Sequence, residues 1–308
     1  MDAALGRRPA WAAVWWQAIR PYSLTASVTP VLVGTAAAAA AGVFHPAPFL
    51  ATLVAAAAIH AGTNLVNDYY DHIRGVDAGQ PIGPGGAIQR NELTPRTVLA
   101  GAVVLFALGG ALGLWLVALR GWPILLVGVL SILAGYAYTG GPLPLGYVAL
   151  GDITVFLFMG VLIVTGAAYV QTGAVLTTAV WASLPVAALV DGILVVNNLR
   201  DLENDRARGK RTLATVIGRR ATRWHALMLL VGAYAAVGAG VLRGVLPSGA
   251  LLSALTAPAA REVWRVVRGA DDPLALTVGG VRGMAQLHLK LGLLLAAGLL
   301  LPALSRAL

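Results

Sequence analysis

The sequence predicts an all-α polytopic membrane protein, a bundle of nine transmembrane helices with loops that cap its cytoplasmic end. Of its 308 residues, 58% are hydrophobic and only 11% are charged, and the mean hydropathy is +0.78. This composition favours one continuous bundle, a single domain over residues 1–308, over two soluble domains. The chain has no cysteine, which excludes disulfides, thiolate nucleophiles and iron–sulfur clusters as its own chemistry.

The first 22 residues are expected to form an interfacial segment, because they combine arginine with tryptophan and tyrosine. Nine apolar segments follow, and the longer ones have the ~20 residues needed to cross ~30 Å of hydrocarbon. They lie near residues 23–42, 48–67, 97–119, 122–139, 148–170, 176–196, 224–242, 245–260 and 287–304. The eighth segment is short, so eight spans are the alternative. The first resembles a signal-peptide core, but its position and the later spans favour a retained helix.

The distribution of basic residues supports this topology. With nine spans and the N-terminus in the cytoplasm, the inner segments hold 19 of the 22 lysines and arginines. The outer side holds only Arg120, Arg243 and Arg306. Cytoplasmic loops normally carry such an excess. The net charge of +9 is therefore interpreted as topology and contact with anionic membrane lipid, and no nucleic-acid partner is expected.

The second apolar segment runs directly into the polar stretch NLVNDYYDHIRGVD, residues 64–77. In a helix, four of its polar side chains share one face, because their offsets are zero, three, four and seven: Asn64, Asn67, Asp68 and Asp71. Gly75 can then end the helix and let Asp77 fold back toward that face. Oxygen ligands suit Mg²⁺, which takes one or two carboxylates and fills its other positions with water and phosphate oxygens. The stretch predicts a magnesium-diphosphate site.

A second polar cluster ends the sixth apolar segment. Amides and acids again follow helical spacing there, at Asn197, Asn198, Asp201 and Asp205. Cationic donors surround them, at Arg200, Arg206, Lys210 and Arg211. Two aspartate clusters at the same membrane face, one with adjacent cations, are what a diphosphate held through Mg²⁺ requires. For either cluster alone, a network that merely caps helix ends is the alternative, and the occurrence of both together argues against it.

Two other protein classes compete with an enzyme. A secondary transporter also has many spans and polar residues near helix ends. However, the spans are not broken by glycine and proline in matching halves, and the acids lie at one face instead of at the midplane. A lipid-binding or scaffold protein would have no need of two clusters of acids and amides.

The chain resembles the UbiA-type intramembrane prenyltransferases, most of all the branch that acts on 1,4-dihydroxy-2-naphthoate. The resemblance covers nearly the whole chain. It rests on Arg20-Pro21, NDYYD at residues 67–71 with Gly75 and Asp77, IGPGGAI at 82–88, YTGGPLPLGYVALGD at 138–152, and NNLRDLENDRARGKRTL at 197–213. The last two motifs discriminate best, and together they favour the naphthoate branch over the hydroxybenzoate branch.

The resemblance implies electrophilic aromatic prenylation, in which an allylic diphosphate leaves and an aromatic ring attacks the resulting carbocation. The expected substrates are a polyprenyl diphosphate and an aromatic acid, giving demethylmenaquinone with loss of CO2. The expected cofactor is Mg²⁺, and no obligate protein partner is evident. The implied location is a bacterial inner membrane, with the active-site loops cytoplasmic. By family pattern, the metal and catalytic ligands are Asp68, Asp71, Asp201 and Asp205, with Asn64, Asn67 and Asn198 in support.

Further residues carry less specific expectations. Substrate contacts are also expected from Asp77, Arg200, Arg206, Lys210 and Tyr138. Tyr138 is a candidate for cation–π support of the carbocation, with packing as the alternative. Arg20 either binds the acceptor carboxylate or marks the membrane boundary, and the boundary is the favoured interpretation. Asp152 is expected to cap the helix that it opens.

Asp191 is a departure from the family pattern, because it places an acid inside the sixth apolar segment. On a helix it lies seven positions before Asn198, on the face that leads to the second cluster. An unpaired carboxylate there costs ~2.5 to 3.5 kcal/mol on insertion scales, so a use is expected. Either it hydrogen-bonds an acceptor hydroxyl, or it ties its helix to a neighbour such as the one that bears His60. The tie is the favoured hypothesis.

Overall fold

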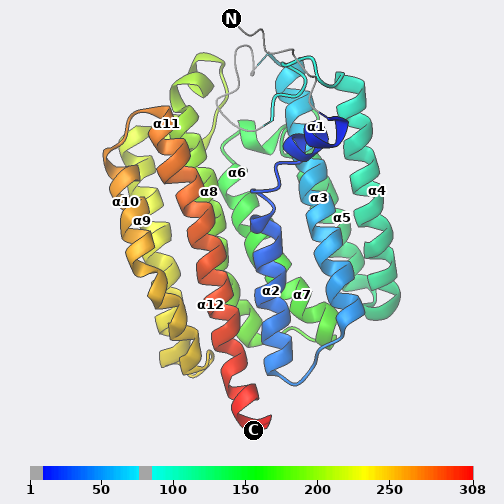
Figure 1. The fold of residues 1–308 in the computed structure, drawn as a ribbon, viewed down its shortest axis with the longest axis vertical. Coiled ribbons are helices and arrows are strands. Elements are labelled where there is room, and N and C mark those ends of the chain that lie inside the picture. The colour runs from blue at the N-terminus through cyan, green and yellow to red at the C-terminus, as the bar shows by residue number, and fades with distance from the viewer. Residues whose placement is uncertain (1–9, 76–84, 308) are drawn as a thin grey trace, which may run out of the picture.

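A computed structural model describes residues 10–75 and 85–307, and its regular elements are helices that run side by side (Figure 1). Successive rods run in opposite directions along the long axis, so the loops gather at two ends. One isolated β-bridge, between Val148 and Arg211, joins two loops within the described ranges. The all-α prediction is confirmed.

The elements have the following bounds. The first half comprises α1 (Trp11–Ala18), α2 (Thr25–Ala40), α3 (Pro46–Ile73), α4 (Pro95–Arg120), α5 (Trp122–Ala137) and the short turn η1 (Leu145–Tyr147). A composite rod follows, made of α6 (Gly151–Thr154), η2 (Val155–Leu162) and α7 (Ile163–Thr172). The second half comprises α8 (Thr177–Ala207), α9 (Leu213–Leu242), η3 (Ser248–Thr256), α10 (Ala257–Gly269), α11 (Pro273–Ala275), η4 (Leu276–Val281) and α12 (Arg282–Ala307).

Six rods in the described ranges are long and apolar enough to cross a membrane. They are α3, α4, the composite rod 151–172, α8, α9 and the rod 273–301. Two further expected spans, α2 and α5, are apolar but have only 16 residues each. The eighth expected span is a 3₁₀ stretch followed by α10, which carries several charged residues. Length and hydropathy thus support six of the nine predicted spans, and the other three segments are helices of the same bundle.

The helices extend further into the polar motifs than the apolar segments predicted. The second apolar segment was expected to end near Asn67, but α3 continues to Ile73. The sixth was expected to end near Val196, but α8 continues to Ala207. Both aspartate motifs therefore lie on helices, and their side chains keep helical spacing.

Close helix packing explains the many small residues. A Cβ at Gly34 of α2 would lie 2.1 Å from the carbonyl oxygen of Val164, and one at Gly292 of α12 would lie 2.0 Å from a side-chain carbon of Thr29. Neither contact leaves room for a methyl group, so glycine lets α2 approach the rods on both sides. As a result α2 is largely buried in the bundle.

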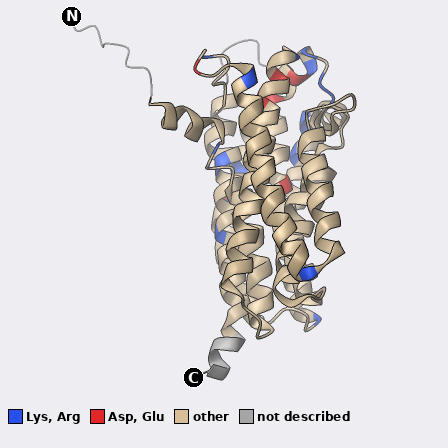
Figure 2. Cartoon of the chain, turned by 90° about the vertical axis from the view of Figure 1, so that its right-hand side faces the viewer, with Lys and Arg blue, Asp and Glu red and all other residues tan. Residues whose placement is uncertain are grey.

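Most of the charged residues gather at one end of the bundle (Figure 2). The C-terminal ends of α3 and α8 lie at this end, together with the N-terminal ends of α4 and α9. Arg120 lies at the opposite end, where α4 finishes, as the topology prediction requires. The helix ends with the polar motifs therefore meet at the charged end.

Candidate active site

A polar cavity of about 380 Å³ lies between the two aspartate motifs. Its wall includes nearly all of the residues expected to bind substrate or metal: Arg20, Asn64, Asn67, Asp68, Asp71, Tyr138, Asn198, Arg200, Asp201, Asp205 and Lys210. Gly85 and Gly86 of the glycine-rich segment also line it. Asp77, expected at this site, lies outside the described residues. Two motifs more than 120 positions apart in the sequence thus line one cavity.

The first motif is held in place by hydrogen bonds on the inner face of α3. Asn64 donates its side-chain N–H groups to the carbonyl of Ile19 and the hydroxyl of Ser23, both at 3.1 Å. Asn67 donates to Asp71 at 2.9 Å. Asp68 and Asp71 are buried, with 3% and 7% of their surfaces exposed. The amides therefore orient the segment that carries the carboxylates.

The second motif has a different set of partners. Arg200 makes a two-pronged contact with Asp201, with its Nε 2.7 Å from Oδ1. Lys210 lies 3.6 Å from Asp205. The other oxygen of Asp205 is buried and has no hydrogen-bond partner among residues 10–75 and 85–307. A buried carboxylate oxygen of this kind on the cavity wall is suited to a cation or to bound water.

Arg20 lies on the cavity wall, so it does more than mark a membrane boundary, and its contact with the acceptor carboxylate stays a prediction. Its guanidinium pairs with Asp68 on the cavity wall. Burial disfavours the charged guanidinium, but the combined attraction of Asp68, Tyr22 and Asp71 raises the pKa of Arg20 above its ordinary value. Arg20 has a φ of 55°, a left-handed conformation that costs energy in a non-glycine residue and often occurs at functional sites.

The glycine-rich segment packs directly on this ion pair. A Cβ at Gly85, which has a φ of 117°, would lie 2.9 Å from a nitrogen of Arg20 and 3.1 Å from an oxygen of Asp68. Only glycine fits both the backbone angle and the space. Arg90 also donates to the carbonyl of Gly85 at 2.7 Å. The segment therefore forms part of the wall beside Asp68.

One residue that was predicted to contact substrate, Arg206, lies away from the cavity. Its guanidinium lies 3.3 Å from Glu203 on an exposed surface. The structure also adds a residue that the sequence analysis did not single out. Arg208 lines the cavity and donates to the carbonyl of Gly75.

Tyr147, which belongs to the motif at 138–152 and is, like Tyr138, a candidate for cation–π support, makes a contact that motif spacing did not predict. Its hydroxyl donates to Asp71, although the two residues are 76 positions apart. Burial, followed by the negative charge of Asp71, raises the pKa of the Tyr147 phenol. The group is therefore a protonated donor at neutral pH.

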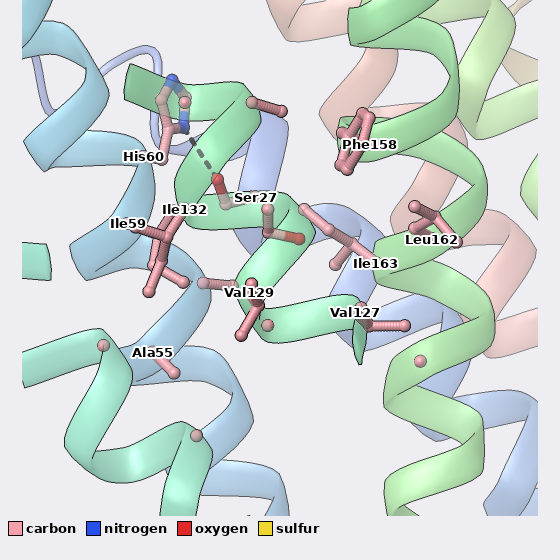
Figure 3. A pocket seen from close by; sticks show the side chains of 18 of the residues that line it. Ser27, Ala55, Ile59, His60, Val127, Val129, Ile132, Phe158, Leu162 and Ile163 are labelled. Carbon is pink, nitrogen blue, oxygen red and sulfur yellow. Dashed lines mark hydrogen bonds between the residues drawn. The ribbon is translucent and has the colours of Figure 1, made fainter. Parts of the chain in front are cut away.

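An apolar groove of about 310 Å³ adjoins the polar cavity. It lies between α3, α5 and the composite rod η2–α7, and Figure 3 shows Ile59, Ile132 and Phe158 among its lining side chains. The groove and the cavity share five lining residues: His60, Thr63, Tyr138, Val155 and Met159. The site thus combines a charged chamber with a hydrocarbon-lined extension.

The two acids inside the bundle have other surroundings than those predicted. Asp152 is not the N-cap of its helix; that position belongs to Leu150. His60 contacts the hydroxyl of Ser27 at 2.7 Å (Figure 3), and the charged neighbour of Asp191 is Asp152. His60 is therefore not the partner of Asp191, and a tie of α8 to another neighbouring helix stays a prediction. Asp191 also does not line the polar cavity.

The donor set fits a metal ion that is shared with a substrate. Within residues 10–75 and 85–307, no three acid or histidine side chains converge to hold an ion. The site instead offers two pairs of aspartates and the unpartnered oxygen of Asp205. Mg²⁺ is typically bound by one or two carboxylates together with substrate phosphates. Asp68, Asp71, Asp201 and Asp205 could hold Mg²⁺ in this way.

Comparisons with known proteins agree with this architecture. The profile of the UbiA prenyltransferase family matches residues 27–279. A Bacillus subtilis protein named 1,4-dihydroxy-2-naphthoate octaprenyltransferase is 33% identical over 94% of this chain and 92% of its own. A Mycobacterium tuberculosis protein of the same name is 37% identical over 87% of this chain and 85% of its own.

A solved structure, a UbiA homolog from Archaeoglobus fulgidus bound to GPP and Mg²⁺, has the same fold. It aligns with a TM-score of 0.66 at 16% identity, over 92% of this chain and 99% of its own. The family match covers most of the chain, both aspartate motifs, all of the residues that line the groove and most of those that line the cavity. The chain therefore belongs to the UbiA prenyltransferase family and is a multi-pass integral membrane enzyme.

Proposed function

We propose that this enzyme transfers a polyprenyl group from an allylic diphosphate to 1,4-dihydroxy-2-naphthoate, with loss of CO2, at the cytoplasmic face of a bacterial inner membrane. The observation that carries the proposal is the continuity of the polar cavity with the apolar groove through five shared lining residues. A prenyl diphosphate has the same two parts, a charged head and a hydrocarbon tail. The names of the relatives in B. subtilis and M. tuberculosis support this acceptor.

The cationic side chains on the cavity wall would bind the diphosphate. Arg200 pairs with Asp201 at 2.7 Å and Lys210 pairs with Asp205 at 3.6 Å. Cationic and carboxylate side chains therefore alternate along this part of the cavity wall. Bound Mg²⁺ would supply further positive charge that stabilises the leaving diphosphate. Arg20 places another guanidinium at the first motif. Charge stabilisation of this kind acts strongly in a site that excludes water.

The groove would hold the isoprenoid chain and keep water away from the reacting carbon. Its lining side chains are mostly aliphatic or aromatic, and small residues such as Gly113 and Gly128 leave space along it. Exclusion of water matters because water would quench an allylic carbocation. An apolar tail also gains about 0.8 kcal/mol for each buried CH₂ group.

The bonds balance without a nucleophile on the protein. The allylic C–O bond breaks and its electron pair leaves with the diphosphate. The ring carbon that bears the carboxylate forms the new C–C bond, and loss of CO2 returns an electron pair to the ring. The product is the prenylated naphthalenediol, which is the reduced form of demethylmenaquinone. The protein positions the reactants and stabilises the departing charge.

A direct assay tests the proposal. Detergent-purified protein is given a polyprenyl diphosphate, with and without Mg²⁺, and one of three acceptors: dihydroxynaphthoate, 4-hydroxybenzoate or homogentisate. We expect magnesium-dependent release of pyrophosphate and CO2 in equal amounts with dihydroxynaphthoate. Faster turnover with either other acceptor would replace the proposed acceptor within the same family. Lack of pyrophosphate release with all three would refute aromatic prenylation.

A further inference from the structure

Tyr147 lies at the end of the turn η1, outside both aspartate motifs, yet it contacts the first one directly. Its hydroxyl donates to one oxygen of Asp71, and Asn67 donates to the other at 2.9 Å. Each carboxylate oxygen has two lone-pair sites, so both oxygens can still accept a cation or a second donor. The two contacts therefore fix the orientation of Asp71 and leave it able to bind a ligand.

The ring of Tyr147 lies beside two cations, one from each motif region. The guanidinium carbon of Arg74 lies 5.0 Å from the ring centroid, three residues after Asp71. The Nζ of Lys210 lies 5.1 Å from the same centroid. Lys210 also pairs with Asp205 of the second motif at 3.6 Å. The ring of Tyr147 thus contacts one cationic side chain near each aspartate motif, Arg74 near the first and Lys210 near the second.

The backbone around Tyr147 is fastened to the same two regions. Arg211 donates its N–H to the carbonyl of Tyr147 at 3.3 Å, and Ala149 donates to the carbonyl of Arg211 at 2.7 Å. Ala149 has a φ of 60°, which is uncommon for a residue with a side chain. Toward the other end of this loop, Arg74 donates to the carbonyls of Thr139 and Gly141. The loop 138–150 therefore bridges the chain segments after the two motifs.

We propose that Tyr147 is a positioning residue that couples the two aspartate motifs, through its hydroxyl to Asp71 and through its ring to Lys210. It does not line the polar cavity, so it acts on the substrate only through these two side chains. The inference rests on the proposed function, because it assigns Asp71 to the metal and Lys210 to the diphosphate. If Tyr147 only packed the loop, loss of its hydroxyl would leave metal binding unchanged.

Two substitutions separate the roles of the hydroxyl and the ring. Tyr147→Phe removes only the donor to Asp71, whereas Tyr147→Leu also removes the aromatic surface beside Lys210. Tyr70→Phe is the matched control: Tyr70 also lies beside Arg74, at 5.2 Å, but its hydroxyl contacts Tyr136 at 2.6 Å instead of an aspartate. All three variants are purified in detergent and checked for their melting temperature without added ligand.

The first readout needs no turnover. Mg²⁺ is titrated in the presence of inorganic pyrophosphate, and the rise in melting temperature is followed, since a ligand that binds only the folded state stabilises it. We expect Tyr147→Phe to need about tenfold more Mg²⁺ for the half-maximal rise, because loss of a hydrogen bond to a charged group typically has such an effect. Tyr70→Phe should match the unaltered protein within about twofold.

The second readout is kinetic. At saturating Mg²⁺, Tyr147→Phe should keep its KM for prenyl diphosphate, whereas Tyr147→Leu should raise that KM severalfold because Lys210 loses its ring contact. A folded Tyr147→Phe protein with an unchanged Mg²⁺ titration would overturn the proposal. Tyr147→Phe keeps the ring, so it decides the matter even if Tyr147→Leu does not fold. Failure of the proposed reaction is seen separately, as absent turnover in the unaltered protein.

Discussion

The guanidinium of Arg20 pairs with the carboxylate of Asp68, so the segment before α2 supplies a cation to the first aspartate motif on α3. Asp68 is almost fully buried, and Gly85 packs against both partners. A buried carboxylate that loses its cation is costly, typically by about 3 to 5 kcal/mol. The stability of this part of the fold therefore depends on the positive charge of Arg20 beside Asp68.

Replacement of Arg20 should destabilise the site in a way that Mg²⁺ partly reverses. We expect Arg20→Gln to lower the melting temperature by several degrees, because Asp68 is left without its cation. Addition of Mg²⁺ should recover part of the loss, since the ion offers the carboxylate another positive charge. Arg96→Gln is the control, because Arg96 is exposed at the start of α4. An Arg20→Gln protein as stable as this control would show that the ion pair contributes little.

Helical periodicity predicted much of the site. Asn64, Asp68 and Asp71 share one face because their spacing matches 3.6 residues per turn, and the structure places all three on the cavity wall. The same arithmetic excludes Arg206. It lies five positions after Asp201, about 140° around the helix, whereas Asp205 lies only about 40° away.

Contacts between distant segments could not be predicted in the same way. Arg20 turns inward because its backbone adopts a left-handed conformation, which the sequence Arg-Pro does not specify. Tyr147 reaches Asp71 only because the loop after α5 folds over the end of α3. The hydropathy pattern alone ended both segments too early, near Asn67 and Val196, whereas the helical spacing of the polar motifs correctly extended the helices beyond them.

Loss of an aspartate in the second motif should abolish turnover without unfolding the protein. Asp201→Asn keeps the size of the side chain but removes the charge that would bind Mg²⁺, so we expect kcat to fall at least 100-fold, or about 2.7 kcal/mol. Glu203→Gln is the matched control two residues later, because Glu203 is exposed and does not line the cavity. Turnover by Asp201→Asn above about a tenth of the unaltered rate would contradict the assignment of Asp201.

A bulky side chain in the groove should shorten the prenyl chain that the enzyme accepts. Gly128 lines the groove ten residues before Tyr138, about 15 Å along α5, and no atom lies within 4 Å of a Cβ there. We expect Gly128→Leu to lower kcat/KM about tenfold for long polyprenyl diphosphates and to leave dimethylallyl diphosphate unaffected. Gly232→Leu on α9 is the control, because Gly232 has equal space but lines neither cavity nor groove. Equal loss for short and long substrates would refute this path for the tail.

Asp191 should be dispensable for chemistry. It does not line the polar cavity, and its charged neighbour is another carboxylate, Asp152. Asp191→Asn removes one of two neighbouring acids and keeps the hydrogen-bonding atoms, so we expect kcat within about threefold of the unaltered enzyme and an equal or higher melting temperature. A tenfold fall in kcat with an unchanged melting temperature would instead support the earlier hypothesis that Asp191 contacts the acceptor.

The charged end of the bundle is expected to face the cytoplasm, because it holds most of the lysines and arginines (Figure 2). The cysteine-free chain permits a direct test with single cysteines in place of exposed alanines at opposite ends. Ala207 ends α8 beside the second motif, and Ala174 lies in the loop between α7 and α8. In intact cells, a membrane-impermeant thiol reagent should label the cysteine at 174 and spare the one at 207. Labelling of position 207 alone would show that the enzyme has the opposite orientation.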